Sequence, residues 1–427
     1  MRKSLARSRD NRIAVLDVGS SKICCFVADI ESGDDPKVIG IGHQASRGVK
    51  SGTVVDMEAT QNAILSTVHA AEQMAGEAIE RVLVNLSGGF PVSFSMAIEV
   101  SIAGHEVGDA DLRRAITHGF QSDSVTGETA RGRQLIHSIP ISYTIDGSSG
   151  IRDPRGMYGD LLGVNMHLVT AGNGPVRNLS TCVQRCHLDV AGFVVSPYAS
   201  GLATLAPDEM SLGATLIDMG GGTTTIAVFL GGNVIFTDVL PIGGEHVTND
   251  IARGLSTPIA DAERMKTLFG HAMAVAADDR EYIDVPQVGE ENDGTPQQVS
   301  RSLLVGIIQP RSEEIFELVR SRLEASGFDK VAGRRVVLTG GASQLPGLRD
   351  LAALILDKQV RVGRPVRLRG LAESTAGPAY ATCAGLISYA ITDDNDFEGP
   401  LMEEARIKPT EPNGLVGRLG GWFREHF

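Results

Sequence analysis

Several classes of protein are excluded by what this 427-residue sequence lacks. No apolar run approaches the roughly 20 residues that a membrane-spanning helix needs. The five cysteines are an odd number without disulfide-like spacing, and Cys182 and Cys186 have no second pair or nearby histidine pattern to complete a zinc site. We therefore expect buried thiols in a reducing cytoplasm. The net charge of −13 argues against a broad nucleic-acid surface.

The sequence also lacks a signal peptide and the two common nucleotide-binding motifs. MRKSLARSRDNR is basic but leads into only four apolar residues before Asp17, too few for a signal peptide. We expect residues 1–11 to form a disordered basic arm. No Gly-Lys dipeptide occurs, so there is no Walker P-loop, and no G-x-G-x-x-G opens a helix after a strand.

Two distant segments share one pattern. Residues 13–30 (IAVLDVGSSKICCFVADI) and 217–229 (IDMGGGTTTIAVF) each contain an apolar arm, Asp-x-Gly, small and hydroxyl residues, and a second apolar arm. Each pattern predicts a β-hairpin. The long-range repeat predicts two similar lobes, each opening with a hairpin.

Strand and helix patterns alternate around these hairpins, which predicts α/β layers. Residues 90–165 look like an inserted module with a strand, a helix near 109–120 and then Gly-rich and polar material. Residues 276–300 predict a loop or a short hairpin. The other expected helices are 58–75, 176–187, 302–326 and 347–356, and the other expected strands are 81–88 and 336–343.

The glycines and hydroxyls of the two turns point to phosphate. A glycine lets a ligand approach the backbone closely, and consecutive turn amides form a concave anion site. Asp17 and Asp218 start the two turns and could hold Mg²⁺ through water. Two ordinary tight hairpins are the alternative interpretation. The same turn pattern occurs in both halves of the chain and is followed by Thr-Gly-Gly-Ala at 339–342, and together these features favour one triphosphate site shared by the two turns.

These residues resemble the actin-like ATPase superfamily, which includes actin, the heat-shock chaperone ATPases, MreB and sugar kinases. Asp17-Val-Gly-Ser-Ser-Lys22 looks like its first phosphate loop, and Asp218-Met-Gly-Gly-Gly-Thr-Thr like the second. Leu338-Thr-Gly-Gly-Ala-Ser looks like the adenosine motif. Asp261-Ala-Glu-Arg-Met-Lys266 resembles the helix bordering adenine and ribose, and 197–201 and 376–385 look like the helices that connect the lobes. The resemblance implies an ATP and Mg²⁺ site, with Asp17 and Asp218 at the metal, built from Asp17, Gly19, Ser20, Ser21, Lys22, Asp218, Gly220, Gly221, Gly222, Thr223, Thr224, Glu263, Lys266, Gly340 and Gly341.

Within the superfamily, the sequence is similar to the FtsA family of bacterial cell-division proteins. Residues 137–159 (HSIPISYTIDGSSGIRDPRGMYG), 242–266 (IGGEHVTNDIARGLSTPIADAERMK) and 336–348 (VVLTGGASQLPGL) carry this resemblance. It implies an α/β, actin-like two-lobed ATPase fold with a small α+β subdomain inserted in the first lobe. The implied divisions are subdomain 1A (12–86, 166–209, 377–392), inserted subdomain 1C (87–165), subdomain 2A (210–249, 330–376) and subdomain 2B (250–329).

The same resemblance implies partners and a location. It predicts protofilaments, later divisome proteins as contacts, and a place on the cytoplasmic face of the cell membrane at the division septum. The C-terminal peptide of the tubulin-like FtsZ would bind the upper second lobe, where Arg301 and Arg311 match basic positions. Solvated surface charge is the alternative for these two arginines.

One departure from the superfamily concerns hydrolysis. Chaperone ATPases and MreB carry a Glu-Pro-x-Ala segment whose glutamate is associated with the attacking water, but this chain reads Ser196-Pro-Tyr-Ala. Phosphoryl transfer depends mostly on positioning and charge stabilisation. We therefore expect nucleotide binding with at most slow hydrolysis, and assign no catalytic residue.

The C-terminal residues have a different composition. Residues 393–404 (DDNDFEGPLMEE) contain acids and no base, which predicts a solvated linker, assigned to 393–412. Residues 413–427 (NGLVGRLGGWFREHF) predict an amphipathic membrane-targeting helix that is coil in water because of its glycines. A frayed end or a helix docked on the body are the alternatives. The apolar, lipid-facing side chains would be Leu415, Val416, Leu419, Trp422, Phe423 and Phe427.

Two other functions could use the same cleft. A small-molecule kinase needs a catalytic Asp or an Arg set aimed at an acceptor, and we identify none. A chaperone-type ATPase needs a peptide-binding β-domain after the cleft, whereas only an acidic linker and a fifteen-residue helix follow residue 392.

Overall fold

A computed structural model describes residues 12–30, 36–120, 132–289, 297–366 and 368–392. The predicted arm 1–11, acidic linker 393–412 and membrane-targeting helix 413–427 lie outside the described residues. Within the described ranges, no helix has both the length and the apolar character needed to cross a membrane.

A five-stranded sheet forms the centre of the first lobe. Strands β1 (Arg12–Val18), β2 (Lys22–Asp29) and β3 (Lys37–Ala45) form an antiparallel meander. Strands β6 (Arg81–Leu86) and β11 (Asp189–Val195) extend it in parallel from β1, giving the order β11-β6-β1-β2-β3.

The second lobe repeats this topology. Strands β12 (Ala214–Met219), β13 (Thr224–Leu230) and β14 (Asn233–Leu240) form the meander. Strands β17 (Arg335–Thr339) and β18 (Gln359–Val362) add in parallel from β12, giving β14-β13-β12-β17-β18. The prediction of two similar lobes, each opening with a hairpin, is confirmed.

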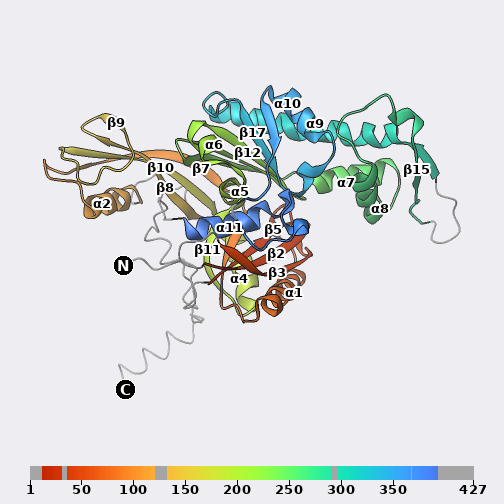
Figure 1. The fold of residues 1–427 in the computed structure, drawn as a ribbon, viewed down its shortest axis with the longest axis horizontal. Coiled ribbons are helices and arrows are strands. Elements are labelled where there is room, and N and C mark those ends of the chain that lie inside the picture. Colours follow the sequence, from red (N-terminus) through yellow and green to blue (C-terminus); the bar gives the residue numbers. More distant parts are fainter. Residues whose placement is uncertain (1–11, 31–35, 121–131, 290–296, 367, 393–427) are drawn as a thin grey trace, which may run out of the picture.

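Helices cover both faces of the first sheet. On one face, α1 (Met57–Ala75) and α4 (Asn173–Arg185) pack their apolar stripes against the strands. On the other, α5 (Ser196–Thr204) and α11 (Ala381–Ile391) pack together between the lobes (Figure 1). These two are the connecting helices that the sequence predicted.

The second lobe has a large and a small part. Helices α9 (Arg301–Ser326) and α10 (Leu348–Leu356) pack on its sheet. A separate core joins α9 to four further elements: α7 (Gly244–Gly254), α8 (Ile259–Phe269), β15 (Tyr282–Val285) and β16 (Gln297–Ser300). Because β15 and β16 pair antiparallel, the hairpin alternative predicted within 276–300 is correct.

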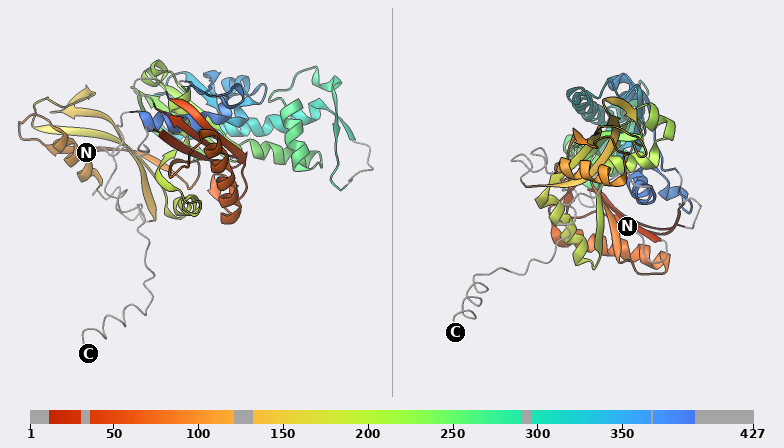
Figure 2. Two further views of the ribbon diagram at one scale, coloured as in Figure 1. Left: turned by 60° about the horizontal axis from the view of Figure 1, so that its bottom comes forward. Right: turned by 90° about the vertical axis from the view of Figure 1, so that its left-hand side faces the viewer.

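The inserted segment forms a separate subdomain at the end of the molecule opposite to β15 (Figures 1 and 2). The expected strand and helix are present as β7 (Val92–Ser101) and α2 (Asp109–Phe120). The expectation of Gly-rich, polar material after them was wrong, because β8 (Arg133–Ile145), β9 (Ser148–Ile151) and β10 (Leu161–Gly172) complete a sheet of order β7-β10-β8-β9. Its core contains Ile98, Leu112, Ile145 and Leu162.

The remaining elements are short connections. They are β4 (Val49–Lys50), β5 (Thr53–Val54), α6 (Pro207–Leu212), η2 (Asp278–Arg280), η3 (Gly341–Gln344), η4 (Glu373–Thr375) and η5 (Pro378–Tyr380).

Candidate functional site

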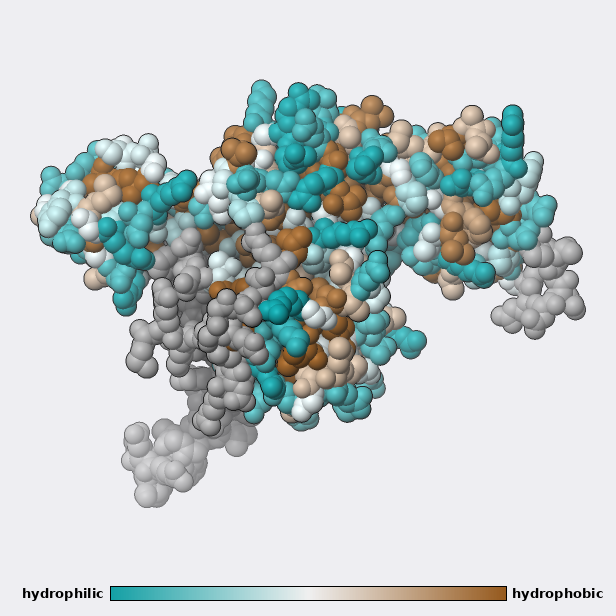
Figure 3. Space-filling view, viewed as in Figure 1, coloured by the Kyte–Doolittle hydropathy of each residue, from teal (hydrophilic) through white to brown (hydrophobic). Residues whose placement is uncertain are grey.

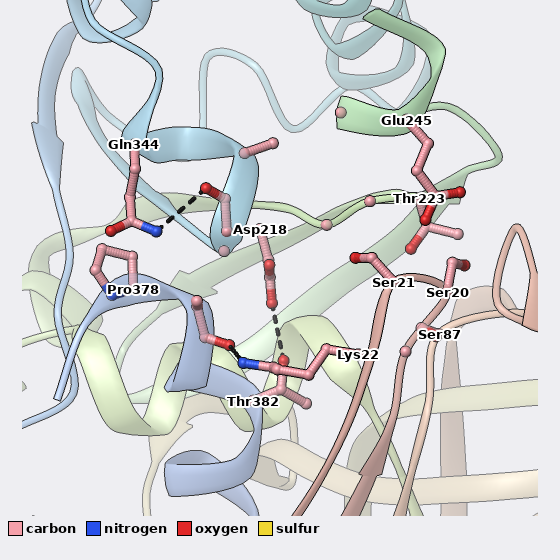
Figure 4. Close-up of a pocket in the computed structure, with 18 of the residues that line it drawn as sticks. Ser20, Ser21, Lys22, Ser87, Asp218, Thr223, Glu245, Gln344, Pro378 and Thr382 are labelled. Carbon is pink, nitrogen blue, oxygen red and sulfur yellow. Dashed lines mark hydrogen bonds between the residues drawn. The ribbon is translucent and has the colours of Figure 1, made fainter. Parts of the chain in front are cut away.

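The turns of the two predicted hairpins face each other across one cavity. The β1–β2 turn begins after Val18 and the β12–β13 turn after Met219, and both line a cavity of about 480 Å³ between the lobes (Figure 4). Each turn is closed by a backbone bond across it: Gly19 N–H donates to Lys22 at 3.0 Å, and Gly220 N–H to Thr223 at 2.8 Å. The internal sequence repeat thus brings two like turns to one site.

Glycines allow the turns to approach this closely. A β-carbon built on Gly221 would lie 2.4 Å from Oγ of Ser21, and one on Gly222 would lie 2.4 Å from Oγ of Ser20. The second turn is also held by α7, because a β-carbon on Gly243 would lie 2.5 Å from the Gly220 carbonyl oxygen. Any larger residue would push the turns apart.

Two aspartates lie at the floor of the cavity. Burial raises the pKa of Asp17 to about 7; Lys22 opposes that rise and the Asp218 charge adds to it. Burial also raises the pKa of Asp218, although Ser200 and Thr382 both donate to its Oδ2, the latter at 3.0 Å. Two buried carboxylates whose pKa values are both raised by burial would be stabilised as anions by a cation placed between them.

Lys22 contributes the positive charge nearest to these aspartates. Its Nζ donates to the Ala379 carbonyl at 2.7 Å and lies 3.4 Å from the centroid of the Tyr380 ring. The first hairpin is therefore tied to η5, the turn that leads into α11.

The Thr-Gly-Gly-Ala segment closes another wall. Gly340 has φ of 85°, and a β-carbon there would lie 2.3 Å from Oδ1 of Asp218, so both its conformation and its contacts require glycine. Gly341 begins η3 and lines the cavity. Opposite it, Lys266 Nζ donates to Glu263 at 2.6 Å and to Thr248 Oγ1 at 2.8 Å, which joins α8 to α7.

All the residues predicted to bind nucleotide line this cavity except Gly222 and Thr224. Gly222 packs against Ser20, and the buried Thr224 hydroxyl donates to the Ile242 carbonyl at 2.8 Å. The sequence does not predict the lining residues at strand ends and helix starts, because no local motif marks those positions. The exception is Gly243-Gly244 before Glu245, a pair of glycines that indicates close contact with another backbone segment. The missed residues include Asn85, Ser87, Thr225, Gly244, Glu245, Gln344, Pro378, Ala379 and Thr382.

The cavity fits a polyanion with a hard cation. The N–H groups of Ser20, Ser21 and Gly221 have no backbone acceptor within the described part of the chain, and they lie in turns that can cradle an anion. The buried Thr225 hydroxyl lines the cavity without a hydrogen-bond partner. No group of three or more His, Cys, Asp or Glu among the described residues could hold a metal. A cation here would therefore take few protein ligands, which suits Mg²⁺.

The two arginines predicted for peptide binding lie elsewhere, on α9. Arg301 donates to the Phe269 carbonyl at 2.9 Å and pairs with Asp278 at 3.2 Å and with Glu281 at 3.0 Å. Arg311 pairs with Asp250 and Glu314. Both arginines are thus already ion-paired, and their side chains are 21% and 27% exposed respectively.

Comparison with solved structures shows which known fold this chain has. The chain is similar to a "PilM-PilN type IV pilus biogenesis complex" chain, with a TM-score of 0.62 at 17% identity over 88% of this chain and 98% of the other. It is also similar to MreB5 of Spiroplasma citri bound to ADP, with a TM-score of 0.53 at 14% identity over 91% and 100% of the two chains. The fold is that of the actin-like ATPases, with an inserted subdomain.

Comparison with other sequences identifies the family. The family model "Cell division protein FtsA" matches residues 215–385, and "SHS2 domain inserted in FTSA" matches residues 88–170. The chain is 44% identical to the cell division protein FtsA of Agrobacterium fabrum, over 100% of this chain and 97% of that protein. It is 32% identical to the Escherichia coli K12 protein of the same name, over 99% and 100% of the two chains. The chain therefore belongs to the FtsA family of bacterial cell-division proteins.

Proposed function

We propose that this protein binds ATP with Mg²⁺ between its lobes, polymerises, and attaches FtsZ filaments to the cytoplasmic membrane at the division septum. The observation that carries the proposal is the pair of matched turns, one from each lobe, that face one cavity floored by Asp17 and Asp218. Solved MreB5 structures with ADP and with AMPPNP, at TM-scores of 0.53 and 0.52, support a nucleotide in this fold.

Each wall of the cavity has a part in this proposal. The turn amides and the hydroxyls of Ser20, Ser21 and Thr223 would hold the phosphates. Glu263, Lys266, Gly340 and Gly341 would border the nucleoside. Mg²⁺, held by Asp17 and Asp218 through water, would neutralise phosphate charge. Because Ser196 stands where related ATPases have a glutamate, we propose that turnover is slow and that ATP acts mainly as a structural ligand.

The membrane contact is assigned to residues 413–427. Their apolar face, which includes Trp422 and Phe423, with Arg418 and Arg424 at its borders, suits the headgroup boundary of a bilayer. One such helix binds weakly, but several on a filament act at high effective concentration, and avidity rises by about 10²–10⁴. Polymerisation would then convert reversible anchoring into firm anchoring.

The FtsZ C-terminal peptide is assigned to the small part of the second lobe. Exposed apolar side chains there include Ile259, Leu268, Tyr282 and Leu303. Figure 3 shows hydrophobic patches among hydrophilic ones over this end of the molecule, near β15 in Figure 1. Because Arg301 and Arg311 are already paired with acids, a peptide carboxylate would have to compete with those acids for them.

Co-sedimentation tests the proposal. With Mg²⁺ and ATP, the full chain should pellet with anionic vesicles and carry an FtsZ C-terminal peptide into the pellet. Deleting residues 413–427 should abolish pelleting and leave ATP and peptide binding intact. Unchanged pelleting of the shortened chain would contradict the anchoring role, and failure of the full chain to bind ATP would contradict the nucleotide site.

A further inference from the structure

Glu245 is a carboxylate that the nucleotide-binding prediction did not include. It follows Gly243 and Gly244 at the start of α7, where its own N–H donates to the Gly221 carbonyl at 2.8 Å. This bond fixes the residue beside the second turn. The side chain lines the cavity and forms no hydrogen bond or ion pair with any described residue.

The side chain points to the end of the cavity where the two turns meet. A β-carbon built on Gly221 would lie 2.8 Å from Oε1 of Glu245 and 2.4 Å from Oγ of Ser21, so carboxylate and hydroxyl flank the same glycine. Figure 4 shows Glu245 beside Thr223 and directed toward Ser20 and Ser21. The terminal phosphate of a nucleotide held by both turns would lie at this end.

The other acids of the cavity have other parts in the proposed site. Asp218 accepts hydrogen bonds from Ser200 and Thr382, and Asp17, whose pKa the Asp218 charge helps to raise, is assigned with Asp218 to the proposed Mg²⁺ site. Glu263 pairs with Lys266 at 2.6 Å, toward the nucleoside end. Among the described acids that line the cavity, Glu245 is therefore the one with no hydrogen-bonded partner and no part in the proposed metal and nucleoside contacts.

Asn85 and Ser196, on the first-lobe side of the cavity, cannot supply such a group. Asn85 Nδ2 donates to Ser196 Oγ at 3.1 Å, and its Oδ1 accepts from Val18 N–H at 2.6 Å. Both side chains are neutral. A water bound by these two side chains alone would find no carboxylate to accept its proton, and Asp17, the first-lobe acid of the cavity, is assigned to Mg²⁺.

We propose that Glu245, from the second lobe, orients the water molecule that attacks the terminal phosphate of bound ATP; this inference rests on the proposed function. The water oxygen forms the new bond to the γ-phosphorus while the bond from that phosphorus to the β–γ bridging oxygen breaks. ADP takes the bonding electron pair. The water proton passes to the Glu245 carboxylate and then to solvent, leaving ADP and inorganic phosphate.

The charge of Glu245 sets a second expectation. The Glu245 carboxylate would repel the ATP phosphates, so both can occupy the cavity only if water or a cation lies between them. Neutralising the side chain should therefore not weaken ATP binding and should slow hydrolysis. Damage to the fold would instead weaken both.

The test compares the full chain with E245Q, E245D and E317Q. Glu317 is an exposed acid of α9, remote from the cavity, and serves as the matched control. Binding is measured by titration with a fluorescent ATP analogue and Mg²⁺, and turnover by inorganic phosphate release over hours. E245Q should keep or improve the Kd and lower the release rate at least about tenfold. E245D should fall between E245Q and the full chain, and E317Q should match the full chain.

Two results would overturn the inference while leaving ATP binding in place. One is E245Q releasing phosphate at the rate of the full chain. The other is a full chain that binds ATP but releases no phosphate above the protein-free background. If the full chain fails to bind the analogue, the proposed nucleotide site fails, and the role of Glu245 fails with it.

Discussion

Lys22 and Tyr380 form a cation–π contact, with Nζ 3.4 Å from the ring centroid. The two residues come from opposite ends of the chain, because Lys22 begins β2 and Tyr380 ends η5. The same ammonium donates to Ala379 at 2.7 Å and lines the cavity. The Lys22 side chain thus joins the first hairpin to η5, the turn before α11. Its positive charge would also attract any phosphate that enters the cavity.

Replacing Lys22 with Gln should weaken Mg²⁺-ATP binding by about 10- to 150-fold, since a charge-assisted bond of roughly 1.5–3 kcal/mol is lost. Titration with a fluorescent ATP analogue measures the change. Lys37→Gln, at an exposed position of β3, should leave the Kd unchanged. Equal affinities for K22Q and the full chain would show that Lys22 only joins the hairpin to η5.

The adjacent glycines Gly340 and Gly341 should respond differently to substitution by Ala. At Gly340 the φ of 85° and the 2.3 Å approach to Asp218 Oδ1 leave no room for a β-carbon. At Gly341 the nearest atom would be 3.8 Å away. We expect G340A to lower thermal stability without ligand, by about 1–3 kcal/mol.

G341A should keep the thermal stability of the full chain. It should bind ATP more weakly, because Gly341 lines the cavity and the added methyl group would take up space that the nucleotide needs. Thermal melts without ligand, followed by nucleotide titration, separate the two effects. Normal melting of G340A would contradict the role assigned to its backbone conformation.

The parts of the fold that could be predicted are those whose signal is local. Each hairpin carries its own apolar arms and its own Asp-x-Gly turn, and the repeat of that pattern predicts two similar lobes. Strands β8 to β10 were missed because polar residues and Pro140 interrupt their apolar positions, and a bulge shifts the register beside that proline. Their core exists only once the strands pair.

The candidate site divides in the same way. Asp17, Lys22 and Asp218 could be found because they sit in or next to recognisable turns. Asn85 and Thr382 reach the cavity only through parallel strand pairing and helix packing, which leave no motif in the sequence. Positional likeness singled out Arg301 and Arg311, but of their acidic partners only Glu314 lies on the same helix; Asp250, Asp278 and Glu281 come from other segments.

Replacing Arg301 with Ala should destabilise the small part of the second lobe. Its guanidinium pairs with Asp278, which is fully buried, and removal leaves that carboxylate uncompensated. The loss should be about 3 kcal/mol, measured by chemical denaturation. Arg280→Ala, at an exposed neighbouring position, is the control and should change stability by less than about 0.5 kcal/mol. If R301A is as stable as the full chain, any loss of FtsZ-peptide binding would report a direct contact.

Glu209 and Arg361 should make the stability of the second lobe depend on pH. Arg361 Nε donates to Glu209 Oε1 at 2.8 Å, and Arg361 also donates to Glu209 Oε2 and to the Thr204 carbonyl. The Arg361 hydrogen bonds, helped by the Ala206 N–H and by Arg335, hold the pKa of Glu209 below its usual value, against the opposing effect of burial. The resulting stability is complete above the unfolded-state value of about 4.3 and is lost as pH falls through the lower folded-state pKa.

Glu209→Gln should therefore be less stable than the full chain by about 1 kcal/mol at pH 7. The difference should shrink below pH ~4, because the native side chain then becomes neutral as well. Denaturant melts from pH 7 down to pH 3 measure the difference. Asp208→Asn changes the exposed neighbouring acid of α6 and should give a smaller difference at pH 7. A gap between E209Q and the full chain that stays constant across this range would mean that the loss comes from packing and not from the charge on Glu209.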